Sequence, residues 1–148
     1  MGTRGKVVAV CSSAEKGEKK RPVAVGVLKA GHGMVGDAHA GSSRQVSLLA
    51  SESINEMQKL GLELAPGDFA ENLTIQGVAL HLLPVGTRLE IGKDAVLEIT
   101  QIGKECHDRC AIYERVGTCV MPTHGVFARV VRDGEVKEGD AIAVVPND

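Results

Sequence analysis

Two thiols, an imidazole and a guanidinium lie together in the segment 103–113, GKECHDRCAIY. A cysteine acts as a nucleophile or a soft metal ligand only as the thiolate, and a neighbouring positive charge lowers the pKa of a thiol. Arg109 stands directly beside Cys110, and His107 lies three residues before it. The sequence therefore indicates sulfur or metal chemistry at Cys110 or Cys106, with His107 as an acid or base.

Two alternatives for these cysteines stay open. Free cysteine is also common as a small buried apolar side chain, which would make Cys110 structural. Cys106, Cys110, Cys119 and His124 could instead form a zinc site, because zinc accepts thiolate and imidazole ligands, although their spacing is not that of paired zinc knuckles. Cys119, flanked by Thr118 and Val120, and Cys11, at the end of a predicted strand, are predicted to be buried.

The glycine-rich segment 30–41, AGHGMVGDAHAG, is a second candidate site. Gly36, Asp37 and His39 place backbone N–H groups, a carboxylate and an imidazole in one loop, which suits an oxyanion or phosphate where the amides converge. The alternative is a solvated turn. The glycine spacing does not match the dinucleotide-binding fingerprint, and the chain has no Walker sequence.

Arg44 and Asn72 complete the set of candidate binding residues. Arg44 follows the glycine-rich segment, and a guanidinium recognises phosphate or carboxylate in a bidentate manner. A surface arginine is the alternative. Asn72, within the segment 67–74, GDFAENLT, stands where a loop becomes a strand. It either binds a ligand or caps a turn through its side chain.

Composition limits the classes of protein. A chain of 148 residues is the size of one ordinary domain, so residues 1–148 are predicted to form a single domain. With no Trp, one Tyr and two Phe, its core must be built mostly from Val, Leu, Ile and Ala. A net charge of -2 and the shortage of stacking aromatics disfavour nucleic-acid binding.

The sequence also predicts where the protein is located and whether its cysteines are reduced. No run approaches the roughly 20 apolar residues that span a bilayer, and the first residues lack the apolar block of a signal peptide. We expect a cytoplasmic protein that does not enter membranes. Its four cysteines are then expected to be mostly free thiols.

Short apolar runs separated by turns predict a mainly β fold. The run 51–60 predicts a helix with Ser51 or Ser53 as its N-cap and Gly61 as its stop. The charged run 12–21 predicts a surface loop. The Asp133-Gly134 pair predicts a hairpin. Many short strands joined by such turns favour a barrel or sandwich with one or two short helices. The predicted strands are 5–11, 23–28, 44–49, 71–75, 88–91, 95–102, 126–131 and 141–145.

The chain resembles the MOSC domain family, named for the C-terminal domain of molybdenum cofactor sulfurase. The resemblance covers most of the chain and rests on the order and spacing of several motifs together. The motifs are GDAHAG at 36–41, RQVSL at 44–48, GDFAENLT at 67–74, the Arg109-Cys110 pair, GVFARVV at 125–131 and Gly139-Asp140.

The resemblance implies a barrel similar to the β-barrel domain of pyruvate kinase and a site for the molybdopterin form of molybdenum cofactor. It implies that Cys110 carries sulfur as a persulfide or ligates molybdenum, with Cys106 as the competing candidate. The phosphate of the pterin would be held by arginines and loop amides. The implied cofactor-binding residues are Gly36, Asp37, His39, Arg44, Gln45, Asn72, Arg109 and Cys110.

The chain departs from the full sulfurase because it has no aminotransferase-like domain with a lysine for pyridoxal phosphate. A separate sulfur donor, such as a cysteine desulfurase, and a molybdoenzyme acceptor are therefore the implied partners. It also lacks the N-terminal β-barrel of the amidoxime-reducing relatives. A chaperone that binds molybdenum cofactor without turnover is the alternative function, and a zinc-stabilised interaction domain is another.

Overall fold

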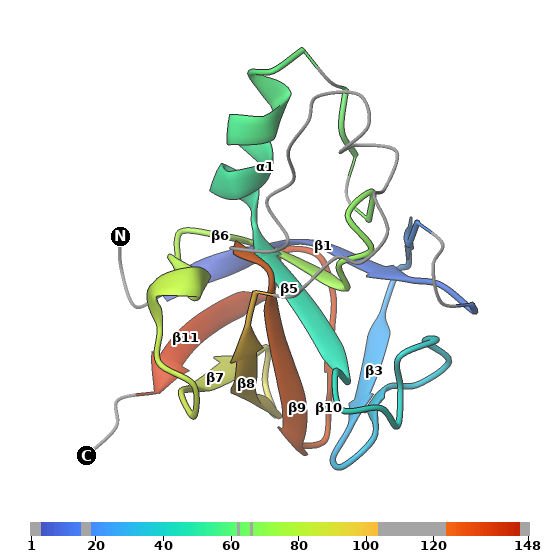
Figure 1. Ribbon diagram of the computed structural model, residues 1–148. Coiled ribbons are helices and arrows are strands. Elements are labelled where there is room, and N and C mark those ends of the chain that lie inside the picture. Colours follow the sequence, from blue (N-terminus) through green and yellow to red (C-terminus); the bar gives the residue numbers. More distant parts are fainter. Residues whose placement is uncertain (1–3, 16–18, 62, 66, 104–123, 146–148) are drawn as a thin grey trace.

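A closed β-barrel is the framework of the protein (Figure 1). The computed structural model describes residues 4–15, 19–61, 63–65, 67–103 and 124–145. Its strands are β1 (Arg4–Ser12), β2 (Arg21–Pro22), β3 (Gly26–Lys29), β4 (Gly33–Met34), β5 (Val46–Ala50), β6 (Leu73–Gln76), β7 (Arg88–Ile91), β8 (Ala95–Ile102), β9 (Val126–Arg132), β10 (Gly134–Val136) and β11 (Ala141–Val145). Helix α1 spans Ser51–Gln58, and the 3-10 helix η1 spans Leu80–Leu82.

Among the described residues, seven strands close the barrel in the order β11-β7-β8-β9-β5-β6-β1, with β1 pairing back onto β11. The neighbouring pairs are antiparallel except β5 and β6, which run parallel and are connected through α1. A smaller sheet, β10-β3-β4, lies beside the barrel (Figure 1). The predicted mainly β barrel with short helices is confirmed.

Aliphatic side chains fill the barrel, as the composition predicts. Strand β7 alternates exposed and buried residues, so one face points into the barrel and the other to solvent. The interior cluster consists of Val, Leu, Ile, Ala and one Met, including the fully buried Leu48, Leu89 and Leu97. Cys11 is also fully buried and free, which confirms that prediction.

Both phenylalanines lie in a second cluster outside the barrel. Leu49, Ile54, Met57, Phe69 and Phe127 pack together where α1 stands at the end of β5 (Figure 1). Strand β5 is buried along its whole length because one face lines the barrel and the other is covered. The strand that follows Arg44 is therefore held firmly on both sides.

The predicted serine cap of α1 is wrong. Ala50 occupies the N-cap position, and no side chain caps the helix. Ser51 hydrogen-bonds Glu52, while the Ser53 hydroxyl lies 2.9 Å from Nδ1 of His124. The Ser53 hydroxyl, which the local pattern predicts to cap the helix, thus makes a tertiary contact with His124. The helix ends at Gln58, before Gly61, whose φ is +94°.

The predicted hairpin at Asp133-Gly134 forms a different pairing. Strand β10 pairs with β3, with Gly134 opposite Leu28, and not with the preceding β9. Asp133 Oδ1 accepts a 2.6 Å hydrogen bond from the backbone N–H of Ala30, which ties the turn to the end of β3. Asp133, which favours a turn, therefore also hydrogen-bonds a residue next to a strand that is distant in the sequence. Strands β2, β4 and β10 were not predicted.

Within the described residues, no helix is long and apolar enough to cross a membrane.

Candidate functional site

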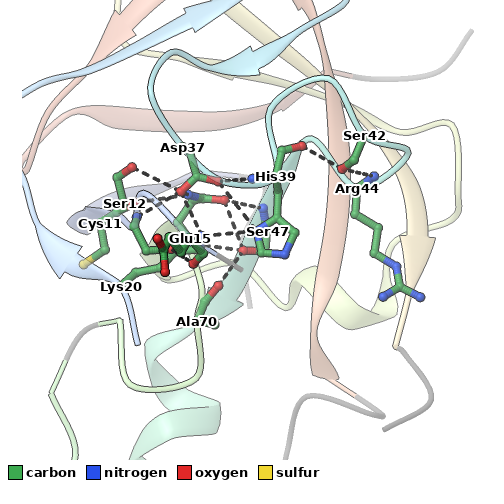
Figure 2. A network of polar contacts seen from close by, with 12 residues as sticks. Cys11, Ser12, Glu15, Lys20, Asp37, His39, Ser42, Arg44, Ser47 and Ala70 are labelled. Atoms are coloured by element: carbon green, nitrogen blue, oxygen red, sulfur yellow. Dashed lines mark hydrogen bonds and ion pairs between the residues drawn. The ribbon is translucent and has the colours of Figure 1, made fainter. Parts of the chain in front are cut away.

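Asp37 is the centre of a buried polar network that joins three distant segments (Figure 2). Its carboxylate is fully buried. Oδ1 accepts four hydrogen bonds, and Oδ2 accepts one from the backbone N–H of His39 at 3.0 Å. The donors to Oδ1 are Lys20 Nζ at 2.8 Å, Ser12 Oγ at 3.1 Å, Asn72 Nδ2 at 3.1 Å and the Ser13 backbone N–H at 3.2 Å.

This set of donors keeps the Asp37 carboxylate charged inside the protein. Burial by itself would raise the pKa of Asp37, since it disfavours the charged form. The hydrogen bond and charge of Lys20, with the backbone N–H groups of His39 and Ser13, outweigh burial and lower the pKa below 3.8. Asp37 therefore stays a charged carboxylate, and its oxygens accept hydrogen bonds from other residues of the same chain.

Asn72 connects the network to strand β5. Its Nδ2 donates to the backbone carbonyl of Cys11 and to Asp37, each at 3.1 Å. Its Oδ1 accepts from the backbone N–H of Ser47 at 3.0 Å, and Ser47 Oγ lies 3.2 Å away. Asn72 thus links β1, the loop of Asp37 and β5 just before β6 begins. These contacts are those of a structural link between segments, a role other than the ligand contact and the turn cap that the sequence suggested.

A tight turn immediately before Asn72 places its side chain in this position. Gly67 has a φ of +91° and Ala70 a φ of +62°. Glu71 is fully buried, and its carboxylate accepts from the backbone N–H of Phe69 and from Thr74 Oγ1. Burial raises the pKa of Glu71 despite these hydrogen bonds.

Gly67→Ala is expected to destabilise the protein strongly because a Cβ at this position would lie 2.0 Å from the carbonyl oxygen of Lys20. Gly61→Ala is the matched control, since Gly61 also has a positive φ but nothing within 4 Å of its Cβ position. Both variants carry the strain of a left-handed alanine, and Gly67→Ala adds overpacking of about 1–3 kcal/mol. Urea denaturation measures the difference. Equal midpoints for the two variants would contradict the close approach at Gly67.

His39 lies at the surface of the network. Its side chain is 31% exposed. Its Nδ1 is 3.2 Å from Lys20 Nζ and 3.7 Å from Asp37 Oδ2. Gly36 allows the turn before Asp37, because its φ is +85°. A Cβ at this position would have no atom within 4 Å. The predicted loop residues are thus assembled, with Asp37 buried, His39 half-buried and Gly36 exposed.

Arg44 lies beside the network, with its guanidinium directed away from Asp37 (Figure 2). Ser42 Oγ connects the two parts, since it donates to the His39 carbonyl at 2.6 Å and accepts from the Arg44 backbone N–H at 3.1 Å. The guanidinium carbon lies 5.3 Å from the ring centroid of Phe127. Its Nε is 3.4 Å from Gln101 Oε1. In the described part of the chain, no carboxylate pairs with Arg44.

Gln45, which the family resemblance assigns to the cofactor, has a structural contact. Its Oε1 accepts a 3.0 Å hydrogen bond from the backbone N–H of Val130. This bond joins the start of β5 to β9. The side-chain carbonyl of Gln45 is therefore used within the barrel wall.

Arg44 is connected through Gln101 to Gly103, the last described residue before the segment that carries Cys106 and Cys110. Gln101, its partner, donates from Nε2 to the carbonyl of Gly103 at 2.8 Å. The backbone N–H of Gly103 donates to the carbonyl of Gly125 at 2.6 Å, across the ends of β8 and β9. Cys106, His107, Arg109, Cys110 and Cys119, predicted from the sequence, lie outside the described residues.

A pair of histidines lies near the start of β9. The rings of His81 and His124 stack with centroids 4.0 Å apart and an interplanar angle of 12°. Within the described residues, the buried Nδ1 of His81 has no hydrogen-bond partner. No group of three or more potential metal ligands occurs among the described residues, and the cysteines of the alternative zinc site lie outside them.

Because of this histidine pair, we expect the free energy of unfolding to decrease in mild acid. Burial lowers the pKa of His81 from its ordinary value of 6.5, and charge on His124 lowers it further. The unfolded chain therefore takes up this proton first as the pH falls. Stability should be complete above 6.5 and should decline as the pH falls through the lowered pKa of the folded protein. Urea midpoints measured against pH should fall less in His81→Gln than in the wild type. Identical slopes would contradict this role.

Lys20, Ser12, Ser13 and Ser47 are network residues that the sequence did not reveal. Lys20 is 2% exposed, although it belongs to the run 12–21 that reads as a charged surface loop. The prediction is wrong at this position because Asp37, 17 residues later, neutralises the ammonium inside the protein. No local signal distinguishes Lys20 from its exposed neighbours.

Comparison with known families settles the relationship. The sequence model of the MOSC domain matches residues 35–143, a span that contains Asp37, Arg44, Asn72 and Cys110. The chain belongs to the MOSC domain family. A comparison of this MOSC protein with curated proteins gives no significant match.

Solved structures share the fold. The YuaD protein from Bacillus subtilis superposes with a TM-score of 0.81 at 20% identity, covering 98% of this chain and 97% of YuaD. YiiM from Geobacillus stearothermophilus gives a TM-score of 0.71 at 18% identity, with 96% and 75% covered. YiiM from Escherichia coli gives 0.69 at 18% identity, with 99% and 72% covered. At these identities, the likeness establishes the fold of this MOSC protein.

Proposed function

We propose that this MOSC protein binds the molybdopterin form of molybdenum cofactor and that Cys110 is its reactive thiol. Family membership supplies the class of ligand. The observation that carries the proposal is Arg44, a partly exposed guanidinium that no carboxylate neutralises in the described part of the chain. A guanidinium held in this way suits the phosphate of the pterin.

The proposed cofactor has a phosphate at one end and a soft metal at the other. Arg44, and His39 beside it, would hold the phosphate end. When bound, the cofactor supplies a molybdenum centre that accepts sulfur ligands. Cys11 does not suit this role, because burial, with the Glu71 and Asp68 charges, raises its pKa to about 11. The thiolate is therefore assigned to Cys110, with Cys106 as the competing residue.

The sulfur chemistry proposed for Cys110 is carriage of a persulfide. The Cys110 thiolate would attack the outer sulfur of a donor persulfide, form a new S–S bond and release the donor thiolate. No net oxidation accompanies this exchange. A separate cysteine desulfurase would provide the donor, and a molybdoenzyme would be the acceptor. A chaperone without turnover predicts the same binding but no persulfide on Cys110.

Arg44→Ala is expected to weaken binding of isolated molybdenum cofactor by about 10- to 100-fold, the loss of hydrogen bonds to a charged group. Equilibrium binding under anaerobic conditions measures the effect. Arg129→Ala is the matched control, because Arg129 lies on β9 and already donates from Nε to Glu98 at 2.7 Å. Equal affinity of Arg44→Ala and wild type would remove Arg44 from the site.

A further inference from the structure

The small sheet β10-β3-β4 has an inner face against the barrel and an outer face toward solvent. On the inner face, Leu28, Met34 and Val136 are buried in the hydrophobic cluster of the barrel. Side chains alternate along a strand, so Val27 and Lys29 of β3 point the other way and are exposed. The solvent face of an antiparallel sheet usually carries polar side chains.

Valines instead occupy the middle of this outer face. Val25 and Val27 flank the buried Gly26 and are 45% and 46% exposed. Val35 is 52% exposed, and its backbone N–H donates to the carbonyl of Val27 at 2.8 Å. The register of β3 and β4 therefore places Val35 directly opposite Val27, on the same face. The three valines form one exposed apolar patch, whereas single exposed apolar side chains need no explanation.

Two side chains of opposite charge border the valines. Glu135 of β10 pairs with Val27 on the side away from Val35. Lys29 stands two residues after Val27 on β3. Both are exposed, and neither forms an ion pair with another residue of the described ranges. The patch thus has a positive and a negative border, and such a surface can be complementary to a copy of itself.

We propose that this outer face is the interface of a symmetric dimer of the chain. A two-fold axis that lies between two such faces and passes between Lys29 and Glu135 sets each lysine against the glutamate of the second copy. By the register of the sheet, the same axis brings Val27 and Val35 close to their own copies. A partner with charge of one sign would instead meet either Lys29 or Glu135 with a like charge. The charge pattern therefore favours a second copy as the occupant.

The small area of the patch sets the expected strength. Interfaces of small area belong to weak or transient complexes, so we expect a concentration-dependent dimer with a Kd of about 10–100 μM. The association is a property of the chain without cofactor. Its test is therefore independent of the proposed cofactor site.

Sedimentation velocity of the full chain, over about 1–500 μM, measures the association. The wild type should shift from monomer to dimer within this range. Val27→Glu should weaken association by about 10-fold or more, because it places a charge in the middle of the apolar contact. Leu82→Glu is the matched control, since Leu82 lies on η1, outside the patch, and is 74% exposed. A wild type that stays monomeric, or equal association of Val27→Glu and wild type, would overturn the proposal.

Charge reversal tests the two-fold arrangement. Lys29→Glu and Glu135→Lys each create two like-charge pairs across the axis and should each weaken association by about 10-fold. Mixed in equal amounts, the two variants should associate about as well as the wild type, because one chain presents two carboxylates and the other two ammonium groups. Glu90→Lys makes the same change of charge on β7 and should have no effect. A mixture that associates no better than the separate variants would overturn this interface.

Discussion

Asp37→Ala is expected to destabilise the barrel by about 3–5 kcal/mol, the range for breaking a buried ion pair by removing one partner. The variant leaves the fully buried Lys20 ammonium without a counter-charge. It also removes the acceptor of the Asn72 amide and of two backbone N–H groups, those of Ser13 and His39. The expected result is a large fall in the urea midpoint without a change in far-ultraviolet circular dichroism at low denaturant.

A double variant separates the charge from the hydrogen bonds. Lys20→Met/Asp37→Ala should be less destabilised than Asp37→Ala, because no unpaired charge stays buried. In acid, the contribution of Asp37 should be present above its ordinary pKa of 3.8 and lost as the pH falls through its lowered value in the folded protein. An Asp37→Ala midpoint equal to that of the wild type would show that the network does not hold the fold together.

Cys110→Ser is expected to abolish sulfur loading, because a serine hydroxyl cannot form a persulfide. Incubation of the wild type with a persulfidated cysteine desulfurase should add the mass of one sulfur atom, which intact-mass spectrometry detects. Cys106→Ser and Cys11→Ser should retain the added sulfur. Cys11 is a strong control, since its buried thiol has a pKa of about 11 and is mostly protonated at neutral pH.

The outcomes for the two neighbouring thiols are distinct. Loss of the added sulfur in Cys106→Ser, with retention in Cys110→Ser, would move the reactive thiol to Cys106. Loading of none of the proteins, including the wild type, would contradict persulfide carriage and favour a chaperone that only binds cofactor.

The sequence predicted the barrel strands because their signal is local. The alternation in β7 and β8 and the mostly apolar run of β5 follow directly from which faces are buried. The family motifs also pointed to Asp37 and Asn72, which the structure brings to 3.1 Å from each other. Their contact depends on β1 and β6 being neighbours, which only the fold provides.

The errors occur where a distant partner decides the role of a residue. Lys20 sits in a charged run and becomes buried only because Asp37 neutralises it. Ser53 has the right position and chemistry for a helix cap, but its hydroxyl contacts His124 instead. Strand β10 selects β3 through the bond between Asp133 and Ala30. Each of these choices is made by tertiary contacts, which local patterns do not contain.

The most direct test of the account is the molybdenum and pterin content of the wild-type protein after anaerobic incubation with isolated molybdenum cofactor and gel filtration. The account predicts that molybdenum and pterin elute with the protein in equal amounts and that Arg44→Ala retains much less of both. Elution of the wild type with neither molybdenum nor pterin would contradict the proposed cofactor site.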